Sequence, residues 1–349
     1  MSTWPAPSSR DRSPASSTPP SMDWRGMSGP ETPEGPDEFG QIAEFFRPLT
    51  RGEPGAFDLL DDAAVLPDSG ADQVVVTQDA LVEGVHFPPG EAPEDIAARF
   101  LRVNLSDLAA KGAEPFAWLQ TLAWGPGWSV DRRRAFAREL AREAEAFGLV
   151  LLGGDTVSTP GPLMVSGTFF GRCPPGGMIP RSGAAPGDLL LVSGPVGDGL
   201  LGLQAVTGAI ADPKGRLARK FRRPEPRLDL REVLRRCASA AADISDGLVA
   251  DAGQLARASG CSIRLELERL PLSPEAQDWA ARQASPEAAL LALATGGDDY
   301  EVVLAARPDH RAELEEAGCT VVGVFHVGAA EVLHEGRPLD AGAGGWRHG

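Results

Sequence analysis

Apolar and polar residues along 37–349 follow two kinds of spacing, one typical of strands and one typical of helices. Short apolar runs and helical spacing in the first half predict these elements: strands 73–79, 116–124, 149–155 and 163–171, and helices 93–110 and 129–147. Ser129 is a candidate N-cap of the second helix, and Gly148 a candidate stop. The alternation predicts a mixed α/β fold.

A second set of elements follows the turn-rich stretch "PRSGAAPGD" at 180–188, where we expect a domain boundary. The predicted elements are strands 189–194, 262–268, 300–306 and 320–325, and helices 248–259, 274–295 and 308–317. We therefore expect an N-terminal domain over 37–183 and a C-terminal α/β domain over 184–349. Residues 1–36 are rich in Ser, Pro and Gly and predict a disordered leader, with a transit peptide as an alternative.

The charge balance narrows the function classes. Lys and Arg total 33 against 49 Asp and Glu, and this net charge of −16 argues against binding nucleic acid or an anionic membrane. The sequence holds no membrane-spanning apolar run and no signal-peptide pattern. The basic stretch 214–227 is interpreted as a solvated loop and helix face, with phosphate or nucleic-acid binding as the alternative. Four widely spaced cysteines predict buried free thiols in a reducing compartment, so we expect a soluble, cytoplasmic protein.

Aspartates recur at the edges of apolar runs, beside Gly or Ser. The pair Asp61 and Asp62 lies inside "FDLLDDAAVL", where two adjacent carboxylates repel each other and need a partner. The other members of the pattern are Asp79, Asp107, Asp155, Asp243, Asp246, Asp298 and Asp299. Any one of them alone is more often a turn residue or a helix cap. Together they predict a site for a hard cation such as Mg²⁺, shared with substrate phosphates.

The usual phosphate-binding loops are missing from the sequence. It contains neither G-x-x-x-x-G-K-[ST] nor the glycine loop, paired lysine and His-Arg-Asp signature of protein kinases. If the protein binds a nucleoside triphosphate, we expect its phosphates to be held mainly through metal ions.

The motifs "DDAAVL", "TQDALVEGVHF", "NLSDLAAKGAEP", "GGDT", "PRSGAAPGD", "DISDGL" and "GGDDYE" occur in this order. In this set the chain resembles the thiamine-monophosphate kinase family of the aminoimidazole-ribonucleotide-synthetase-like superfamily, from about Asp37 to Trp346. The resemblance implies two α/β domains and a homodimer in which the N-terminal domains close a barrel-like sheet. It also implies direct in-line transfer of phosphate from ATP to thiamine monophosphate, with several Mg²⁺ ions, as the last step of thiamine diphosphate synthesis.

The resemblance also implies roles for individual residues. Its magnesium ligands fall on Asp62, Thr77, Gln78, Asp79, Asp107, Asp155, Asp243 and Asp246. Its ATP-contacting positions fall on Gly154, Asp155, Arg181 and Ser245. Its positions facing the thiamine phosphate fall on His86, Asp298 and Trp346. The residues expected to carry catalysis are Asp107, Asp155 and Arg181. His86 and Trp346 have packing roles as alternatives.

The chain departs from the family pattern in places. Asp58-Leu59-Leu60 stands where Gly-x-Gly is common, Gln78 replaces Thr, and Lys111 replaces a common Met. Asp298 stands where Glu also occurs. Rival interpretations are a superfamily enzyme acting on a purine precursor or on selenide, and a non-catalytic cation- or nucleotide-binding protein. The selenide enzyme would need an early reactive cysteine, whereas the first one here is Cys173.

Overall fold

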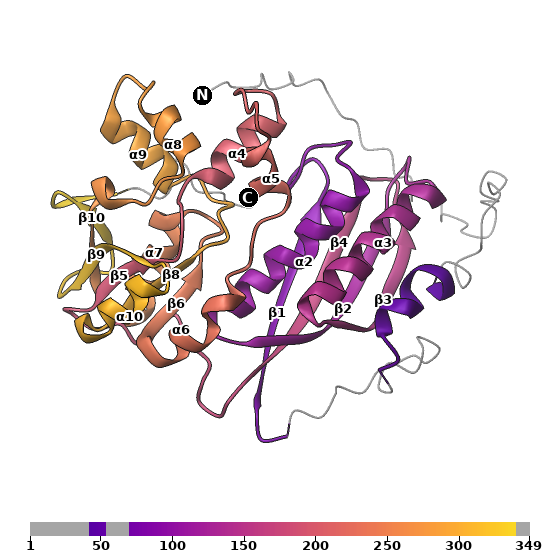
Figure 1. The fold of residues 1–349 in the computed structure, drawn as a ribbon, viewed down its shortest axis with the longest axis horizontal. Coiled ribbons are helices and arrows are strands. Elements are labelled where there is room, and N and C mark those ends of the chain that lie inside the picture. The colour runs from indigo at the N-terminus through magenta and orange to yellow at the C-terminus, as the bar shows by residue number, and fades with distance from the viewer. Residues whose placement is uncertain (1–41, 54–69, 340–349) are drawn as a thin grey trace, which may run out of the picture. The chain divides into compact units, whose positions relative to one another are not determined.

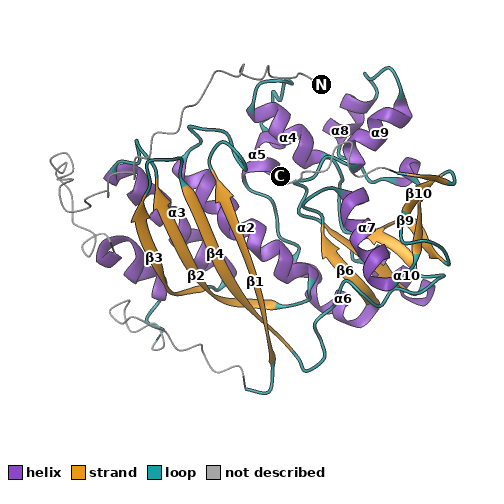
Figure 2. Cartoon of the chain, turned by 180° about the vertical axis from the view of Figure 1, so that it is seen from behind, coloured by secondary structure: helices purple, strands orange, loops and turns teal. Residues whose placement is uncertain are grey.

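The computed structural model describes residues 42–53 and 70–339. Two short helical turns, Ile42–Phe46 and Arg47–Thr50, precede a four-stranded sheet of order β1-β4-β2-β3. Its elements are β1 (Gln73–Val82), β2 (Glu114–Trp124), β3 (Val150–Ser158), β4 (Met164–Cys173), α2 (Pro93–Ala110) and α3 (Val130–Phe147). β4 is antiparallel to β1 and β2, and β3 is parallel to β2. Helices α2 and α3 cover one face of this sheet (Figures 1 and 2).

Aromatic side chains fill the space between α2, α3 and the sheet. Phe100 of α2 meets Phe169 of β4 edge-to-face, and Phe169 stacks on Trp118 of β2. All three are fully buried, and such rings contribute much of the free energy gained by burying apolar area. The opposite face of the sheet carries its own apolar cluster, which includes Phe116 and Phe170.

The caps of α3 are the ones that the sequence predicts. The Ser129 hydroxyl accepts a hydrogen bond from the Arg132 amide at 3.4 Å. Gly148 ends the helix in the left-handed conformation, with φ of 70°. The prediction of α2 is confirmed at both ends.

A seven-stranded mixed sheet of order β11-β10-β7-β9-β5-β8-β6 forms the second half. Its strands are β5 (Leu189–Val192), β6 (Ala238–Asp243), β7 (Ser262–Leu265), β8 (Val302–Ala306), β9 (Thr320–His326), β10 (Val332–His334) and β11 (Arg337–Pro338). Its helices are α4 (Asp198–Val206), α5 (Arg216–Arg222), α6 (Arg231–Cys237), α7 (Leu248–Ser259), α8 (Pro274–Ala280), α9 (Pro286–Ala294) and α10 (Arg311–Glu316). Alternate strand residues face different helices: Leu190 and Val192 join the core with α7, whereas Leu191 joins the core with α6 and α10.

Several predicted boundaries are wrong. β1 continues through Asp79 to Val82 and β3 continues through Asp155 to Ser158, so these carboxylates lie within strands rather than at their ends. Both extensions are held by ladder pairing, Asp79 with Gly167 and Asp155 with Thr121. The strand expected over 262–268 ends at Leu265, and the helix expected over 308–317 begins as a 3₁₀ turn.

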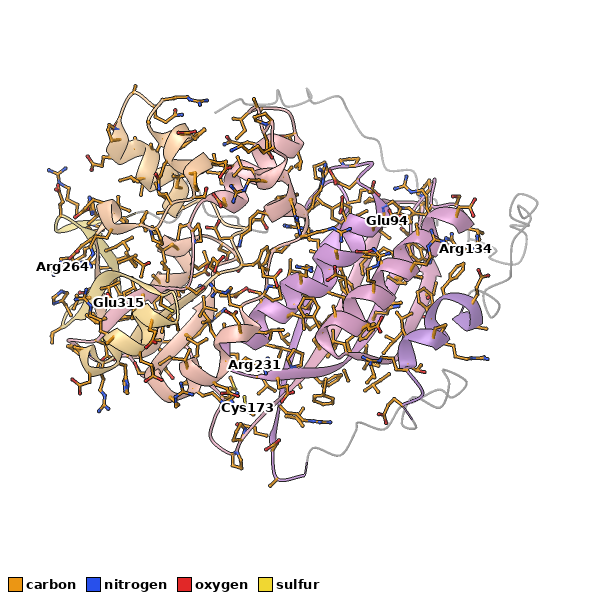
Figure 3. All side chains as sticks on the ribbon, in the orientation of Figure 1. Glu94, Arg134, Cys173, Arg231, Arg264 and Glu315 are labelled. Atoms are coloured by element: carbon orange, nitrogen blue, oxygen red, sulfur yellow. The ribbon has the colours of Figure 1, made fainter. Side chains whose placement is uncertain are left out.

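All four cysteines are buried and free, as predicted; Cys173 lies at the end of β4 (Figure 3). Within residues 42–53 and 70–339, helices are too short or too polar to cross a bilayer. A hydrogen bond joins the residue after α2 to the second sheet: Lys111 Nζ donates to the Ala241 carbonyl oxygen of β6 at 2.7 Å. The domain boundary at 183/184 stays a prediction. The predicted leader, residues 1–36, lies outside the described residues.

Candidate active site

Carboxylates from distant parts of the sequence interact where α2 meets the second sheet. We define the acidic cluster as Asp79 of β1, Asp107 of α2, Asp243 at the end of β6, Asp246 of the following loop and Asp251 of α7. Burial and the neighbouring carboxylates raise the pKa values of Asp79, Asp243 and Asp251. The fold therefore concentrates negative charge at one place, which is unfavourable without a cation.

Asp79 and Asp107 lie at the edge of the cluster nearest the four-stranded sheet. The Thr77 hydroxyl donates to Asp107 Oδ2 at 2.6 Å, which ties β1 to α2. Asp79 remains exposed at the surface, yet neighbouring atoms partly desolvate its carboxyl. This desolvation, together with Asp107 and Asp246, raises the pKa of Asp79 to about 7. Because the group is exposed, dissolved salt weakens the repulsive part of the shift.

Asp243 is the most enclosed member of the cluster. Only 5% of its surface is exposed. Burial raises its pKa well above the usual carboxyl range, and Asp107 and Asp251 raise it further, while a hydrogen bond from Ser106 acts in the opposite direction. A buried carboxylate in such surroundings is stable as an anion only beside a positive charge.

Asp251 shapes the "DISDGL" loop, and sequence reasoning missed it. Its Oδ2 accepts the backbone amides of Ser245, Asp246 and Gly247 at 3.1 to 3.2 Å. Burial and Asp246 raise the pKa of Asp251 to about 7, while the amides and Arg181 lower it. Asp251 could have been found from its place in the first turn of α7, because the backbone amides at a helix start lack acceptors within the helix and a carboxylate there can accept from them.

The "GGDDYE" loop is hydrogen-bonded to the "DISDGL" loop. The Asp298 amide donates to the Ser245 carbonyl, and the Tyr300 amide to the Ile244 carbonyl, each at 2.8 Å. Gly297 permits this approach: its φ is 71°, and a Cβ there would lie 2.6 Å from the Ser245 carbonyl oxygen. The two motifs therefore form one structural unit.

Asp298 is held by a buried arginine. Arg99 Nη2 of α2 lies 2.5 Å from Asp298 Oδ1, and the Tyr300 hydroxyl donates to the same oxygen at 3.0 Å. Asp298 has a left-handed backbone with φ of 62°, a conformation costly for a residue with a Cβ. The next residue, Asp299, is buried and accepts the amides of Gly197 and Gly199 at the start of α4.

Two cations lie within electrostatic reach of the acidic cluster. Lys111 interacts with Asp243 and Asp107, and Arg181 interacts with Asp251 and Lys111. Desolvation and Arg181 lower the pKa of Lys111 to about 8, although the two aspartates act in the opposite direction. Sequence reasoning noted Lys111 as a departure from the family pattern and gave it no role.

Asp155 is not brought to the acidic cluster. Its register partners run from Thr121 to Ser166 to Ala80, so three strand spacings, about 14 Å, separate Asp155 from Ala80. Asp155 is exposed on β3, at the opposite edge of the sheet from β1. Its neighbour Gly154 has a structural role, because a Cβ there would lie 1.9 Å from the Gln120 carbonyl oxygen.

The remaining predicted residues have other positions. Gln78 is an exposed residue of β1. His86 Nδ1 accepts the Val82 amide at 2.9 Å, so its imidazole braces the turn that follows β1. Asp62 and Trp346 lie outside the described residues, as does the Asp58-Leu59-Leu60 departure.

The donor set suits a hard divalent cation. It consists of neighbouring carboxylates, with the Thr77 hydroxyl bonded to Asp107, and burial and repulsion raise the pKa values of Asp79 and Asp243 among them. Mg²⁺ prefers oxygen ligands and commonly combines protein carboxylates with substrate phosphates. The residues present therefore fit a magnesium site that also holds a phosphorylated substrate.

The two α/β halves of this chain match the family models of the AIR synthase related proteins. The N-terminal domain model of that family matches residues 60–173, and its C-terminal domain model matches residues 185–334.

Comparison with individual relatives points to one family within this class. "Thiamine-monophosphate kinase" of Caulobacter vibrioides is 50% identical over 90% of this chain and 91% of its own length. The solved thiamine-monophosphate kinase of Stenotrophomonas maltophilia is 35% identical, with a TM-score of 0.72 over 80% of this chain and 90% of that one. The structure described as "AaThiL complexed with AMPPCP and TMP" is 29% identical, with a TM-score of 0.73 over 82% and 90%. The chain belongs to the thiamine-monophosphate kinase family.

Proposed function

We propose that this protein transfers the γ-phosphoryl group of ATP to thiamine monophosphate, giving ADP and thiamine diphosphate. The observation that carries the proposal is the acidic cluster, whose carboxylates come from β1, α2, β6 and α7 and need a cation. The proposed substrate comes from the names of the relatives. The AaThiL structure, which is similar in fold, was solved with AMPPCP and TMP together, and this supports ATP as the phosphate donor.

The acceptor chemistry matches this donor set. The nucleophile is a phosphate oxygen that is already ionised at neutral pH, so the reaction needs alignment and charge neutralisation rather than a general base. Mg²⁺, when bound, would neutralise phosphate charge. The residues that would hold it are Asp62, Thr77, Gln78, Asp79, Asp107, Asp243 and Asp246. Arg181 would add a fixed positive charge beside the phosphates.

The substrate-binding roles follow the loop arrangement. Ser245 belongs to the loop that Asp251 organises, which supports a contact with ATP phosphates. Asp298 is held in place by Arg99, which supports a contact with thiamine monophosphate through a preset carboxylate. Gly154 on the ATP, and His86 and Trp346 on the thiamine phosphate, complete the proposed contacts.

We propose a homodimer through the four-stranded sheet, and we place Asp155 in the partner's site. On the sheet face opposite α2 and α3, Phe116 and Phe170 are buried in a small apolar cluster, whereas Val76 and Val157 are exposed. Exposed apolar area of this kind is typical of interfaces. Asp155 lies too far from Asp79 to share one ion within a chain.

Subunit complementation tests this arrangement. Asp107→Asn and Asp155→Asn should each be inactive alone, and refolding them together should restore about a quarter of the parent activity, because half of the dimers then hold one intact site. A mixture as inactive as its components would place Asp107 and Asp155 in the same chain's site.

We further propose that residues 37–183 and 184–349 are the two domains, as the separate family-model matches support. We also propose a cytoplasmic protein, an assignment supported by its four buried free thiols.

One assay tests the proposed reaction. Purified protein is incubated with ATP, Mg²⁺ and thiamine monophosphate, and thiamine diphosphate is detected by chromatography. We expect product formation that EDTA abolishes, and no product from unphosphorylated thiamine. ATP and Mg²⁺ binding without product would favour the non-catalytic alternative. Turnover only with a purine precursor or selenide would favour another superfamily reaction.

A further inference from the structure

Lys111 directly follows α2 and reaches from that helix to the second sheet. Its Nζ donates to the Ala241 carbonyl oxygen of β6 at 2.7 Å, two residues before Asp243. Its side chain is half-buried, so the ammonium has limited access to water. The side chain therefore occupies a fixed place between the end of α2 and β6.

This place adjoins the acidic cluster. Asp107 and Lys111 are four residues apart at the end of α2, and the Lys111 amide donates to the Asp107 carbonyl oxygen at 3.1 Å. Both Asp107 and Asp243 interact electrostatically with the ammonium. The carbonyl end of α2 adds further negative potential, which a cation at this position offsets.

We infer that Lys111 is a resident cation of the acidic cluster, a positioning residue that offsets the repulsion between Asp107 and Asp243 and thereby sets the affinity of the cluster for divalent cations. The inference rests on the proposed function, in that the cluster binds a divalent cation. An ammonium has three N–H donors, of which the Ala241 carbonyl takes one. Because a fixed positive charge near carboxylates opposes the arrival of a second cation, Lys111 lowers divalent-cation affinity while it keeps the empty site folded.

The test is a calorimetric titration of the nucleotide-free protein with Mn²⁺ at pH 7.0, where the lysine is charged. Lys111→Met removes the charge and keeps most of the length, and it should bind Mn²⁺ about 3- to 10-fold more tightly than the parent. Lys111→Arg keeps the charge and should stay within about twofold of the parent.

Lys214→Met is the matched control. It makes the same substitution and the same change in net charge at an exposed lysine outside the cluster, and Mn²⁺ affinity should not change. A purely structural role for Lys111 would lower stability without tightening Mn²⁺ binding.

Unchanged or weaker Mn²⁺ binding by Lys111→Met overturns the inference, and so does a parent that takes up no Mn²⁺. If Lys111→Met is not recovered folded, Lys111→Gln carries the same prediction, and unchanged affinity there overturns it equally. The titration contains neither ATP nor thiamine monophosphate. A failure of the proposed reaction would therefore appear only in the activity assay.

Discussion

Two groups of carboxylates in this protein differ in what surrounds them. In the acidic cluster, Asp79, Asp243 and Asp251 lie beside other carboxylates, and their pKa values are raised. We define the paired acids as Glu91, Asp95, Glu139, Glu143 and Glu301, each of which is bonded to an arginine or a lysine. The paired acids are neutralised by cations of the protein itself, whereas most of the negative charge of the acidic cluster is left for a ligand to neutralise.

The cations of the paired acids come largely from the segment 214–227. Lys220 Nζ lies 2.7 Å from Glu301, Arg222 Nε lies 2.6 Å from Glu91, and Arg223 lies 2.7 Å from Asp95. The interpretation of this segment as a solvated helix face is therefore wrong for these side chains. The segment joins α2 and α3 to the second sheet, and its charge is used within the fold.

The largest expected effect is the loss of protein stability when one of the paired acids is removed. Glu301 is 4% exposed, and its carboxylate meets Lys220, Arg227 and the Ser193 hydroxyl. Glu301→Ala removes the carboxylate that pairs with Lys220, leaves Arg227 paired with Asp229 alone, and should lower the free energy of unfolding by about 3–5 kcal/mol. Urea unfolding measures this loss. A loss below about 1 kcal/mol would show that the paired acids do not stabilise the fold.

The next effect is on turnover at the acidic cluster. Asp107→Asn keeps the shape of the side chain but removes a carboxylate, and kcat should fall by about 10²–10³-fold while the protein stays folded. Steady-state kinetics at saturating Mg²⁺, with circular dichroism as the folding control, measure it. Near-parent turnover would remove Asp107 from the catalytic machinery and make the two groups of acids equivalent.

The third effect is the pH dependence of stability in the metal-free protein. Asp251 has a pKa of about 7 in the folded state against 3.8 as a free group, so the folded state binds more protons between pH 4 and 7. Stability from this group is therefore lost as pH rises through that window, by about 2 kcal/mol between pH 5.5 and 8. Asp79 acts in the same direction, weakened by its exposure.

Urea unfolding in EDTA across this pH range measures how the free energy of unfolding falls with pH. The Asp251→Asn variant should lack the contribution of Asp251 to that fall. Added Mg²⁺ should flatten the decline, because a bound cation stabilises the ionised carboxylates. Stability that rises with pH in the absence of metal would contradict the pKa shifts and with them the crowding of the acidic cluster.

The smallest effect is expected at an exposed ion pair on α10. Arg311 Nε lies 2.8 Å from Glu315, and both side chains are exposed. Glu315 is labelled on α10 in Figure 3. Glu315→Ala should change stability by less than about 0.5 kcal/mol, because water and salt screen such pairs. Thermal unfolding measures it, and a loss as large as that of Glu301→Ala would mean that burial does not separate structural pairs from surface pairs.

Local signals predicted much of the fold. α2 was predictable from its helical periodicity and its Pro93 start, and α3 from its periodicity together with the Ser129 cap and the Gly148 stop. β6 was not predicted, although it carries Asp243, because its sequence "ASAAAD" has little strand preference and owes its form to burial beside β8. The ends of β1 and β3 were misplaced because ladder pairing extends them through polar residues that sequence patterns treat as strand ends.

The candidate site was predictable only in part. The recurrence of aspartates pointed to Asp79, Asp107, Asp243 and Asp246, because the residue type itself carries the chemistry. Asp251 and Lys111 were missed because their roles depend on which loop and which strand they reach, which no local spacing encodes. The position of Asp155 at the far sheet edge depends on strand order, which is likewise a property of the whole sheet.

The most direct measurement is a crystal structure of the protein with Mn²⁺ and a non-hydrolysable ATP analogue, with an anomalous-difference map at the manganese absorption edge. We expect peaks among Asp79, Asp107 and Asp243, in contact with the analogue's phosphates, and none beside the paired acids. A map with no peak at the acidic cluster, or with its carboxylates neutralised by protein cations alone, would contradict it.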